Sequence, residues 1–370
     1  MLIRKVSAVI ITALLLIPFF SFISYSAEYD IEEKILEESN AKSIFDYLDG
    51  ESTVILNSFG IDGLNLSEIY SVTPLKLITN IINIFKGKLK KPLKLFFILV
   101  FIITFQAITS SFTCENEEKG ELFFQIFILI ISIVPCVEIF NIAYSQIYLI
   151  SDFMIAYVPV YATLLSIAGK FTQSVNFNIT VFSLSEIIVS VSKNYLVPVI
   201  NTLFCFNIAS AINPVMPLKN VSKLIKKVLT VALTLISTVF TGVLTIKNII
   251  GANIDAITVK SVKTLSGSFI PIIGSSLGDS LSSVIGSINI INNSIGFLGI
   301  LILIAIGLPV ITELFLWYLC FYVSSVIADS FGFKSSAVLL SISEILSIVN
   351  IIVIFVLLVF IISTGIMLSR

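Results

Sequence analysis

Apolar runs long enough to cross a membrane recur along most of the chain, separated by short polar breaks. An α-helix needs about 20 mostly apolar residues to span the hydrocarbon core of a bilayer. We expect such runs at residues 95–112, 122–150, 153–169, 177–192, 196–212, 228–246, 295–328 and 348–368. The run at 295–328 is too long for one upright span, and Pro309 within it predicts a helix pair or a broken helix. The pattern therefore predicts an all-α, polytopic membrane domain over residues 95–370, with about eight membrane-embedded runs.

The first residues have the pattern of a secretion signal. Two basic residues precede an apolar core at residues 6–23, and Ser24 and Ser26 provide the small residues that a cleavage site requires. This pattern predicts a signal peptide at residues 1–26, or an uncleaved signal anchor. In either case the segment that follows leaves the cytoplasm.

Residues 27–94 are the expected extracytoplasmic segment. Their first part is strongly acidic, with apolar residues at helical spacing, and predicts short amphipathic helices. Residues 74–85 are also amphipathic and fit a helix on the membrane surface. The segment ends in a basic juxtamembrane stretch with five lysines at residues 86–94. It is too short to bury a large core of its own, so we interpret it as a small helical cap.

Two lysine clusters bear on the orientation of the chain. Lysines beside a span favour the cytoplasmic side, but the signal peptide places the cluster at 86–94 outside. We follow the signal peptide, so that this cluster faces anionic headgroups or a partner. The second cluster, at residues 219–227, is then cytoplasmic, which requires an odd number of crossings between residues 94 and 219.

Composition supports the membrane assignment and excludes several kinds of chemistry. Apolar residues make up 57% of the chain and charged residues only 12%, about half the usual share for a soluble domain. The net charge of −1 gives no reason to expect nucleic-acid binding. The chain has no histidine, which removes Ser-His triads and most zinc sites. The four cysteines are widely spaced, and no phosphate-binding loop is present. We therefore expect no enzyme activity, cofactor or metal.

Several acidic residues lie within or beside the apolar runs. The clearest are Glu138, Glu186 and Glu313; Asp279 and Glu344 belong to the same group. A charge at the centre of a bilayer costs about 3 kcal/mol or more. Each residue therefore faces protein, water or a cation, or lies near the end of a span. One interpretation is a polar path for ions or small solutes, and the other is ordinary tolerance of charge near the interfaces.

Residues 251–293 are rich in glycine and serine, yet apolar enough to lie in or on a bilayer. Small residues at a spacing of four allow two membrane helices to approach closely. We interpret this stretch as a re-entrant or packing region, either a tight helix pair or part of a pore. The candidate packing or conduit residues are Gly267, Pro271, Gly274, Gly278, Asp279, Ser282 and Gly286.

The same stretch resembles a known family. Residues 241–246 (TGVLTI) and 260–280 (KSVKTLSGSFIPIIGSSLGDS) resemble the corresponding stretch of the stage III sporulation protein AE family of endospore-forming Firmicutes. This chain departs from the family pattern at Lys247, where the family has glutamine, and at Ser275 and Ser276, which replace a pair of small residues.

The resemblance implies a non-enzymatic subunit of the channel, or feeding-tube, complex that links mother cell and forespore and supports late forespore development. It implies a multi-pass location in the mother-cell membrane around the forespore. The implied partners are other stage III sporulation membrane proteins, including a separate ATPase subunit, together with membrane lipid. Two alternatives remain: a stand-alone ion-coupled transporter or permease using Glu138, Glu186 or Glu313, and an intramembrane enzyme. The chain shows no convincing internal repeat, which disfavours an inverted-repeat transporter.

Overall fold

The computed structural model describes residues 35–65, 68–69, 72–112, 117–212, 218–269 and 274–368, and all its regular elements are helical. The expected signal peptide and Pro271 lie outside these residues. Two short elements come first, the 3₁₀-helix η2 (Ala41–Tyr47) and α3 (Gly50–Phe59). Asp49 caps α3, because its side chain accepts a hydrogen bond from the backbone N–H of Ser52 at 3.0 Å.

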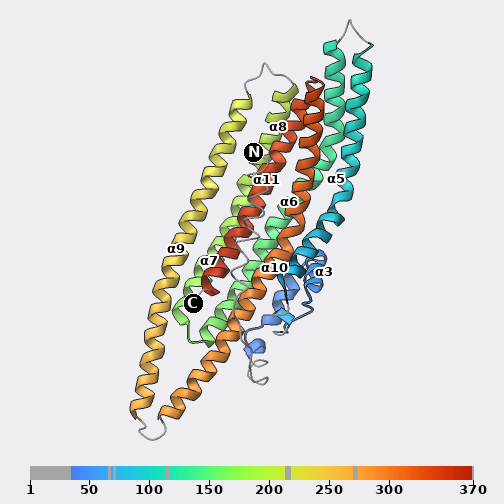
Figure 1. Cartoon of the computed structure of the whole chain (residues 1–370). Helices are drawn as coiled ribbons and strands as arrows, with labels where there is room; N and C mark the ends of the chain where they lie inside the picture. Colours follow the sequence, from blue (N-terminus) through green and yellow to red (C-terminus); the bar gives the residue numbers. More distant parts are fainter. Residues whose placement is uncertain are drawn as a thin grey trace.

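A bundle of long helices follows (Figure 1). Its members are α5 (Pro74–Ser110), α6 (Glu117–Ile167), α7 (Phe171–Val191), the π-turn η3 (Ser192–Leu196), α8 (Val197–Ile212), α9 (Leu218–Phe269), α10 (Gly274–Ser330) and α11 (Ser335–Leu368). The chain passes from α7 through η3 into α8 without a loop, so these three elements make one traverse of the bundle. Successive traverses run in opposite directions.

Among the described residues, six stretches are long and apolar enough to cross a membrane. The sequence led us to expect about eight, because it divided α6 into two runs and separated α7 from α8. It also favoured a pair or a break within residues 295–328, which belong to α10. Pro135 and Pro159 lie inside one continuous α6, and Pro309 lies inside one continuous α10. Proline is tolerated within membrane helices where neighbouring groups satisfy the freed backbone.

The revised count keeps the expected relation between the two ends of the bundle. α5, α6 and the α7–α8 rod make three traverses between residues 94 and 219, which is an odd number. The C-terminal ends of α5, α8 and α10 lie at one end of the bundle (Figure 1). The acidic segment with α3 and the end of α11 lie toward the other. We call these the loop end and the cap end.

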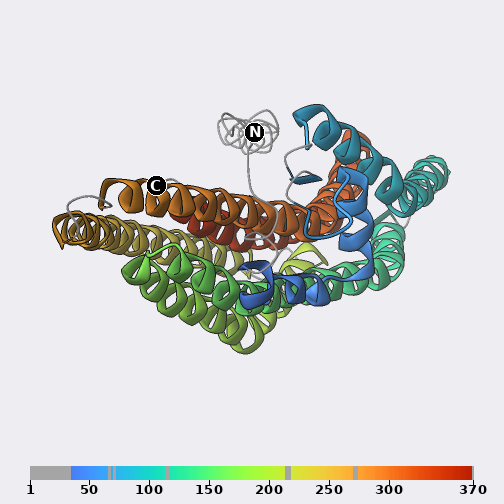
Figure 2. The same cartoon turned by 90° about the horizontal axis from the view of Figure 1, so that it is seen from below.

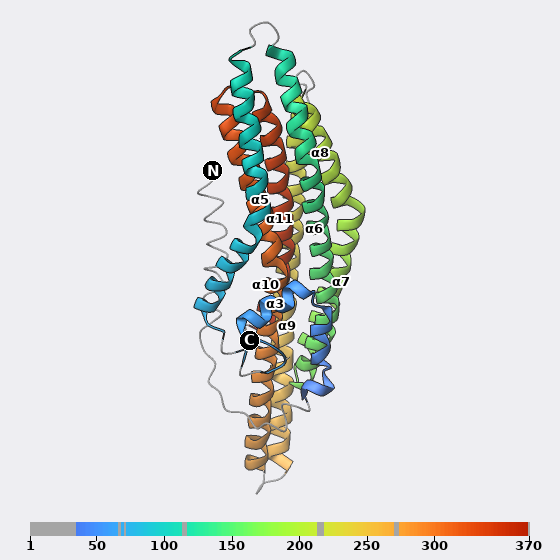
Figure 3. The same ribbon diagram turned by 90° about the vertical axis from the view of Figure 1, so that its right-hand side faces the viewer.

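α10 and α11 form the most buried part of the bundle, whereas the apolar stretch of α9 lies almost wholly on its surface. α9 lies at one edge and α5 at the opposite edge (Figure 2). α9 has 52 residues and α10 has 57, so they are about 78 and 86 Å long, far more than the roughly 30 Å of a bilayer core. Their joined ends project past the other helices at the cap end (Figures 1 and 3).

Glycines of α10 set its close contacts with α6 and α11. A Cβ at Gly299 would collide with the ring of Tyr157, and one at Gly307 would lie 2.7 Å from Leu357. The Tyr157 ring is itself stacked between Phe153 and Tyr161, so it has no room to move aside. These positions fit only glycine as the helices are now packed, which agrees with the use of small residues at membrane helix contacts.

Candidate functional site

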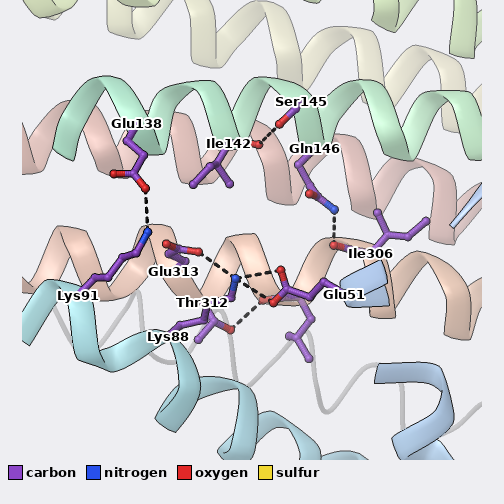
Figure 4. A network of polar contacts seen from close by, with 11 residues as sticks. Glu51, Lys88, Lys91, Glu138, Ile142, Ser145, Gln146, Ile306, Thr312 and Glu313 are labelled. Atoms are coloured by element: carbon purple, nitrogen blue, oxygen red, sulfur yellow. Dashed lines mark hydrogen bonds and ion pairs between the residues drawn. The ribbon is translucent and has the colours of Figure 1, made fainter. Parts of the chain in front are cut away.

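A cluster of charged side chains joins the cap to the bundle, and we call it the ion-pair cluster (Figure 4). At its centre is Lys88 of α5, whose Nζ lies 2.8 Å from Glu51 Oε1 of α3 and 3.1 Å from Glu313 Oε2 of α10. One ammonium group therefore connects the acidic segment to the most buried helix of the bundle. The Glu313 side chain is only 7% exposed, so its charge is costly to bury without the partner that Lys88 supplies.

The second ion pair joins Lys91 of α5 to Glu138 of α6 at 2.8 Å. Lys88 and Lys91 are three residues apart and so lie on the same side of α5. The environment of this pair is different, because the side chains of Lys91 and Glu138 are 66% and 54% exposed. An exposed pair of this kind contributes little to stability, whereas the loss of one partner from a buried pair is costly.

A polar contact within the bundle lies near the same place. The side-chain amide of Gln146 on α6 donates a hydrogen bond to the backbone carbonyl of Ile306 on α10. Three residues on, Pro309 lacks a backbone N–H and interrupts the hydrogen-bond ladder of the helix. The buried glutamine therefore holds α6 against α10 within one turn of the hydrogen bond that Pro309 cannot make.

The ion-pair cluster marks one limit of an apolar surface on α5 and α6, which we call the apolar belt. Exposed large apolar side chains occupy residues 93–112, in α5 and the turn that follows it, and residues 122–137 of α6. The α5 part is about 30 Å long, the thickness of a bilayer core. Beyond Glu138 the exposed positions of α6 are Asn141, Ser145, Asp152, Pro159 and Thr163. On α6 the charges thus lie where the surface changes from apolar to polar, at a depth that tolerates them.

A second polar contact, nearer the cap end, holds α7 and α9 together. The carboxylate of Asp255 on α9 accepts hydrogen bonds from the backbone N–H groups of Thr172 at 2.9 Å and Gln173 at 3.0 Å. It therefore caps the N-terminus of α7 from another helix, where the helix dipole favours a negative charge. Burial lowers the pKa of Lys170 just before α7, and the charge of Asp255 opposes this shift.

Amide side chains extend this contact to the last helix. Gln173 donates to Asn248 of α9, which in turn donates to the backbone carbonyl of Ile366 on α11 at 2.7 Å. A Cβ at Gly251 would lie 3.2 Å from Gln173, so glycine lets α9 approach α7 here. Sequence reasoning missed this site. Its signal was the polar stripe of Asn248, Gly251 and Asp255, which share one face of an otherwise apolar helix.

The structure brings two of the three predicted intramembrane charges together. Glu138 and Glu313 both belong to the ion-pair cluster, and their partners lie in the lysine stretch that was expected to meet a partner or headgroups. Glu186 is exposed on α7 and lies outside the cluster.

The glycine and serine positions have a different outcome. Gly267 lies near the end of α9, and Gly274, Gly278, Asp279 and Ser282 lie in the first turns of α10. The structure describes the helix there but not the surroundings of those side chains, so their packing role stays a prediction. Gly286 is exposed, and nothing lies within 4 Å of where its Cβ would be. The close contacts that the structure does describe are made farther along α10.

Comparison with known proteins places these features in a family. The family model described as stage III sporulation protein AE matches residues 65–370. The stage III sporulation protein AE of Bacillus subtilis (strain 168) is 23% identical to this chain over 274 residues. The matched region is 74% of this chain and 65% of the relative, so the chain spans about two thirds of the relative's length. No solved structure matches the chain.

Proposed function

Because the chain belongs to the stage III sporulation protein AE family, we propose that it is a non-enzymatic membrane subunit of the sporulation complex that links mother cell and forespore. In this proposal it lies in the mother-cell membrane around the forespore. Other stage III sporulation membrane proteins and a separate ATPase subunit are its partners. The complex acts as a channel that supports late development of the forespore.

The observation that carries this proposal is the extent of the family match. It begins at residue 65 and includes all six stretches that are long and apolar enough to cross a membrane. The proposed role therefore rests on the whole bundle and not on one short motif.

The cap end of the bundle is the part that suits contacts across the space between the two membranes. The acidic segment with α3 lies there, and the joined ends of α9 and α10 project in the same direction (Figure 3). Lys88 fixes α3 to the bundle through Glu51, which orients the segment relative to the membrane. We assign this end to the extracytoplasmic side, where it would meet partner subunits.

The placement of the acidic residues disfavours a stand-alone ion-coupled transporter. Such a mechanism needs carboxylates along a path inside the bundle. The side chains of Glu138 and Glu186 are exposed on the surface of the bundle. The carboxylate of Glu313 forms an ion pair with Lys88, which also pairs with Glu51. None of the three residues proposed for ion coupling is an unpaired carboxylate within the bundle.

A clean deletion in the native organism, followed through sporulation by microscopy, tests the proposal. We expect normal vegetative growth and arrest after engulfment, with a small or collapsing forespore. A copy of the gene expressed only in the mother cell should restore spores, and one expressed only in the forespore should not. Normal spores combined with a growth or uptake defect would overturn the proposal in favour of a transporter.

A further inference from the structure

The N-terminal turns of α5, residues 75–90, are exposed on two of their three sides. They precede the apolar belt along the same helix and curve away from the bundle (Figure 3). Gly87 and Pro92 lie where this segment joins the rest of α5, and both residues are known causes of helix bending. We call residues 75–90 the α5 arm.

One side of the α5 arm is held by protein. The side-chain amide of Asn80 donates a hydrogen bond to the Ser58 carbonyl of α3 at 3.0 Å, and Leu77 and Ile84 pack against the core on the same side. Lys88 continues this side into the ion-pair cluster. The arm therefore has a fixed rotation about its own axis.

A second side is apolar and exposed. It carries large side chains at helical spacing, each between 37% and 73% exposed: Leu75, Ile78, Ile81, Ile82 and Phe85. This side continues directly into the apolar belt, whose first exposed residue on α5 is Leu93. An apolar surface in line with one that faces lipid is suited to the same environment.

The third side is polar and basic. Lys76, Thr79, Asn83, Lys86 and Lys90 follow one another along it, and all five are exposed. The apolar and basic sides adjoin one another, which is the arrangement of a helix lying at a membrane interface. Lysines at that level attract anionic headgroups.

The position of the α5 arm fixes its depth. The Lys91–Glu138 pair lies at the limit of the apolar belt, and the arm begins immediately beyond it. We propose that the α5 arm is an interfacial anchor. Its apolar side is buried at the headgroup boundary of the leaflet at the cap end, and its basic side binds anionic lipid headgroups. This inference concerns how the protein lies in the membrane, so it is independent of the sporulation role.

Tryptophan fluorescence of the full-length protein in lipid nanodiscs tests the anchor. The chain has one tryptophan, the buried Trp317, so W317F provides a background in which a single new tryptophan reports. Phe85→Trp places the reporter on the apolar side, and Asn83→Trp, two residues away, is the matched control on the basic side. Quenching is measured with brominated phosphatidylcholine from the lipid side and with iodide from the water side.

We expect brominated lipid to quench Phe85→Trp at least ~2-fold more strongly than Asn83→Trp, with iodide showing the reverse order. Equal access of iodide to both reporters would place the arm in water and overturn the proposal. Protection of Phe85→Trp from both quenchers would show that protein covers this side, which also overturns it. Ile82→Trp repeats the measurement on the apolar side if Phe85→Trp does not fold.

The lipid charge is tested separately. With phosphatidylglycerol added to the nanodiscs, quenching of Phe85→Trp by brominated lipid should rise, and the double variant K86E/K90E should abolish that rise. A response to phosphatidylglycerol that is the same with and without these substitutions would remove the headgroup contact from the proposal.

Discussion

At the scale of single residues, burial decides which of the two lysines of the ion-pair cluster matters for stability. Lys88→Met removes the partner of the buried Glu313 and should destabilise the protein by about 3 kcal/mol, as expected when one member of a buried pair is lost. Lys91→Met is the matched control, because its pair is exposed and should cost less than about 1 kcal/mol. The melting temperature of the purified protein in detergent measures both changes.

Removing both buried charges gives a further check on this prediction. K88M/E313Q leaves no uncompensated charge, so it should recover much of the stability that K88M loses. If K88M and K91M lowered the melting temperature equally, the two pairs would share one environment, contrary to their exposures.

The glycines of α10 give a second prediction at this scale. Gly299→Ala should destabilise the protein by about 1–3 kcal/mol, because its methyl group would overlap the ring of Tyr157. Gly286→Ala has open space and should be neutral or stabilise the helix by up to about 1 kcal/mol. Thermal unfolding in detergent distinguishes them, and a tolerated Gly299→Ala together with a harmful Gly286→Ala would contradict the packing described here.

The candidate site could be predicted only in part from these residues. Glu138 and Glu313 stand out because charge is costly within apolar runs. Their partners could not be assigned, because Lys91 and Glu138 are 47 residues apart and their contact depends on how two long helices align. The contacts of the glycine and serine residues at a spacing of four could not be assigned either. The spacing shows that Gly286 can pack closely, but it does not show that a neighbour is present.

At the scale of elements, Asp255 links the start of α7 to α9. Asp255→Ala would leave two backbone N–H groups of α7 without their acceptor and should cost about 1–2 kcal/mol. Hydrogen exchange in the first turn of α7 should increase, while exchange in the middle of α10 stays unchanged. Asp255→Asn keeps one acceptor oxygen and should have a smaller effect. Unchanged protection of Thr172 and Gln173 in D255A would show that the cap does not hold α7.

Element types followed from the sequence more reliably than element boundaries. Apolar runs with helical length predicted helices correctly, and no prediction of a strand was needed. Polar residues and a proline misled the division into runs. Ser151 and Asp152, where the sequence divided α6, lie inside one continuous helix, and Pro309 lies inside a continuous α10, where neighbouring groups can support it. The join between α7 and α8 at η3 is a local widening of the helix and not a loop, which residue type alone does not reveal.

At the scale of the whole molecule, the exposed apolar surface lies at different heights on opposite sides of the bundle. Apart from the α5 arm, which we place at the interface, the exposed apolar surface beside α5 occupies residues 93–112, toward the loop end. On α7 it occupies residues 171–187, toward the cap end. A flat bilayer can meet both surfaces only if the bundle axis is tilted from the membrane normal, as membrane helices commonly are. Tilt also accommodates part of the excess length of α9 and α10.

The two ends of the bundle should lie on opposite sides of the membrane, and single cysteines can report this. Asp46→Cys lies in the cap, and Lys223→Cys and Ala337→Cys lie at the loop end; all three positions are exposed. Replacing Cys114 and Cys205 by serine leaves Cys136 and Cys320, which are buried and shielded from a charged reagent. A membrane-impermeant maleimide applied to intact growing cells should then label Asp46→Cys alone, and permeabilised cells should show labelling at all three positions.

The number of traverses explains this expectation. Three traverses separate Asp46 from Lys223, so these two sites should lie on opposite sides of the membrane. Two more separate Lys223 from Ala337, so these two sites should lie on the same side. Labelling of Lys223→Cys and Ala337→Cys on different sides would show that α9 and α10 do not both cross the membrane. Labelling of both loop-end sites and not Asp46→Cys in intact cells would retain the six crossings but reverse the orientation, placing the acidic cap in the cytoplasm.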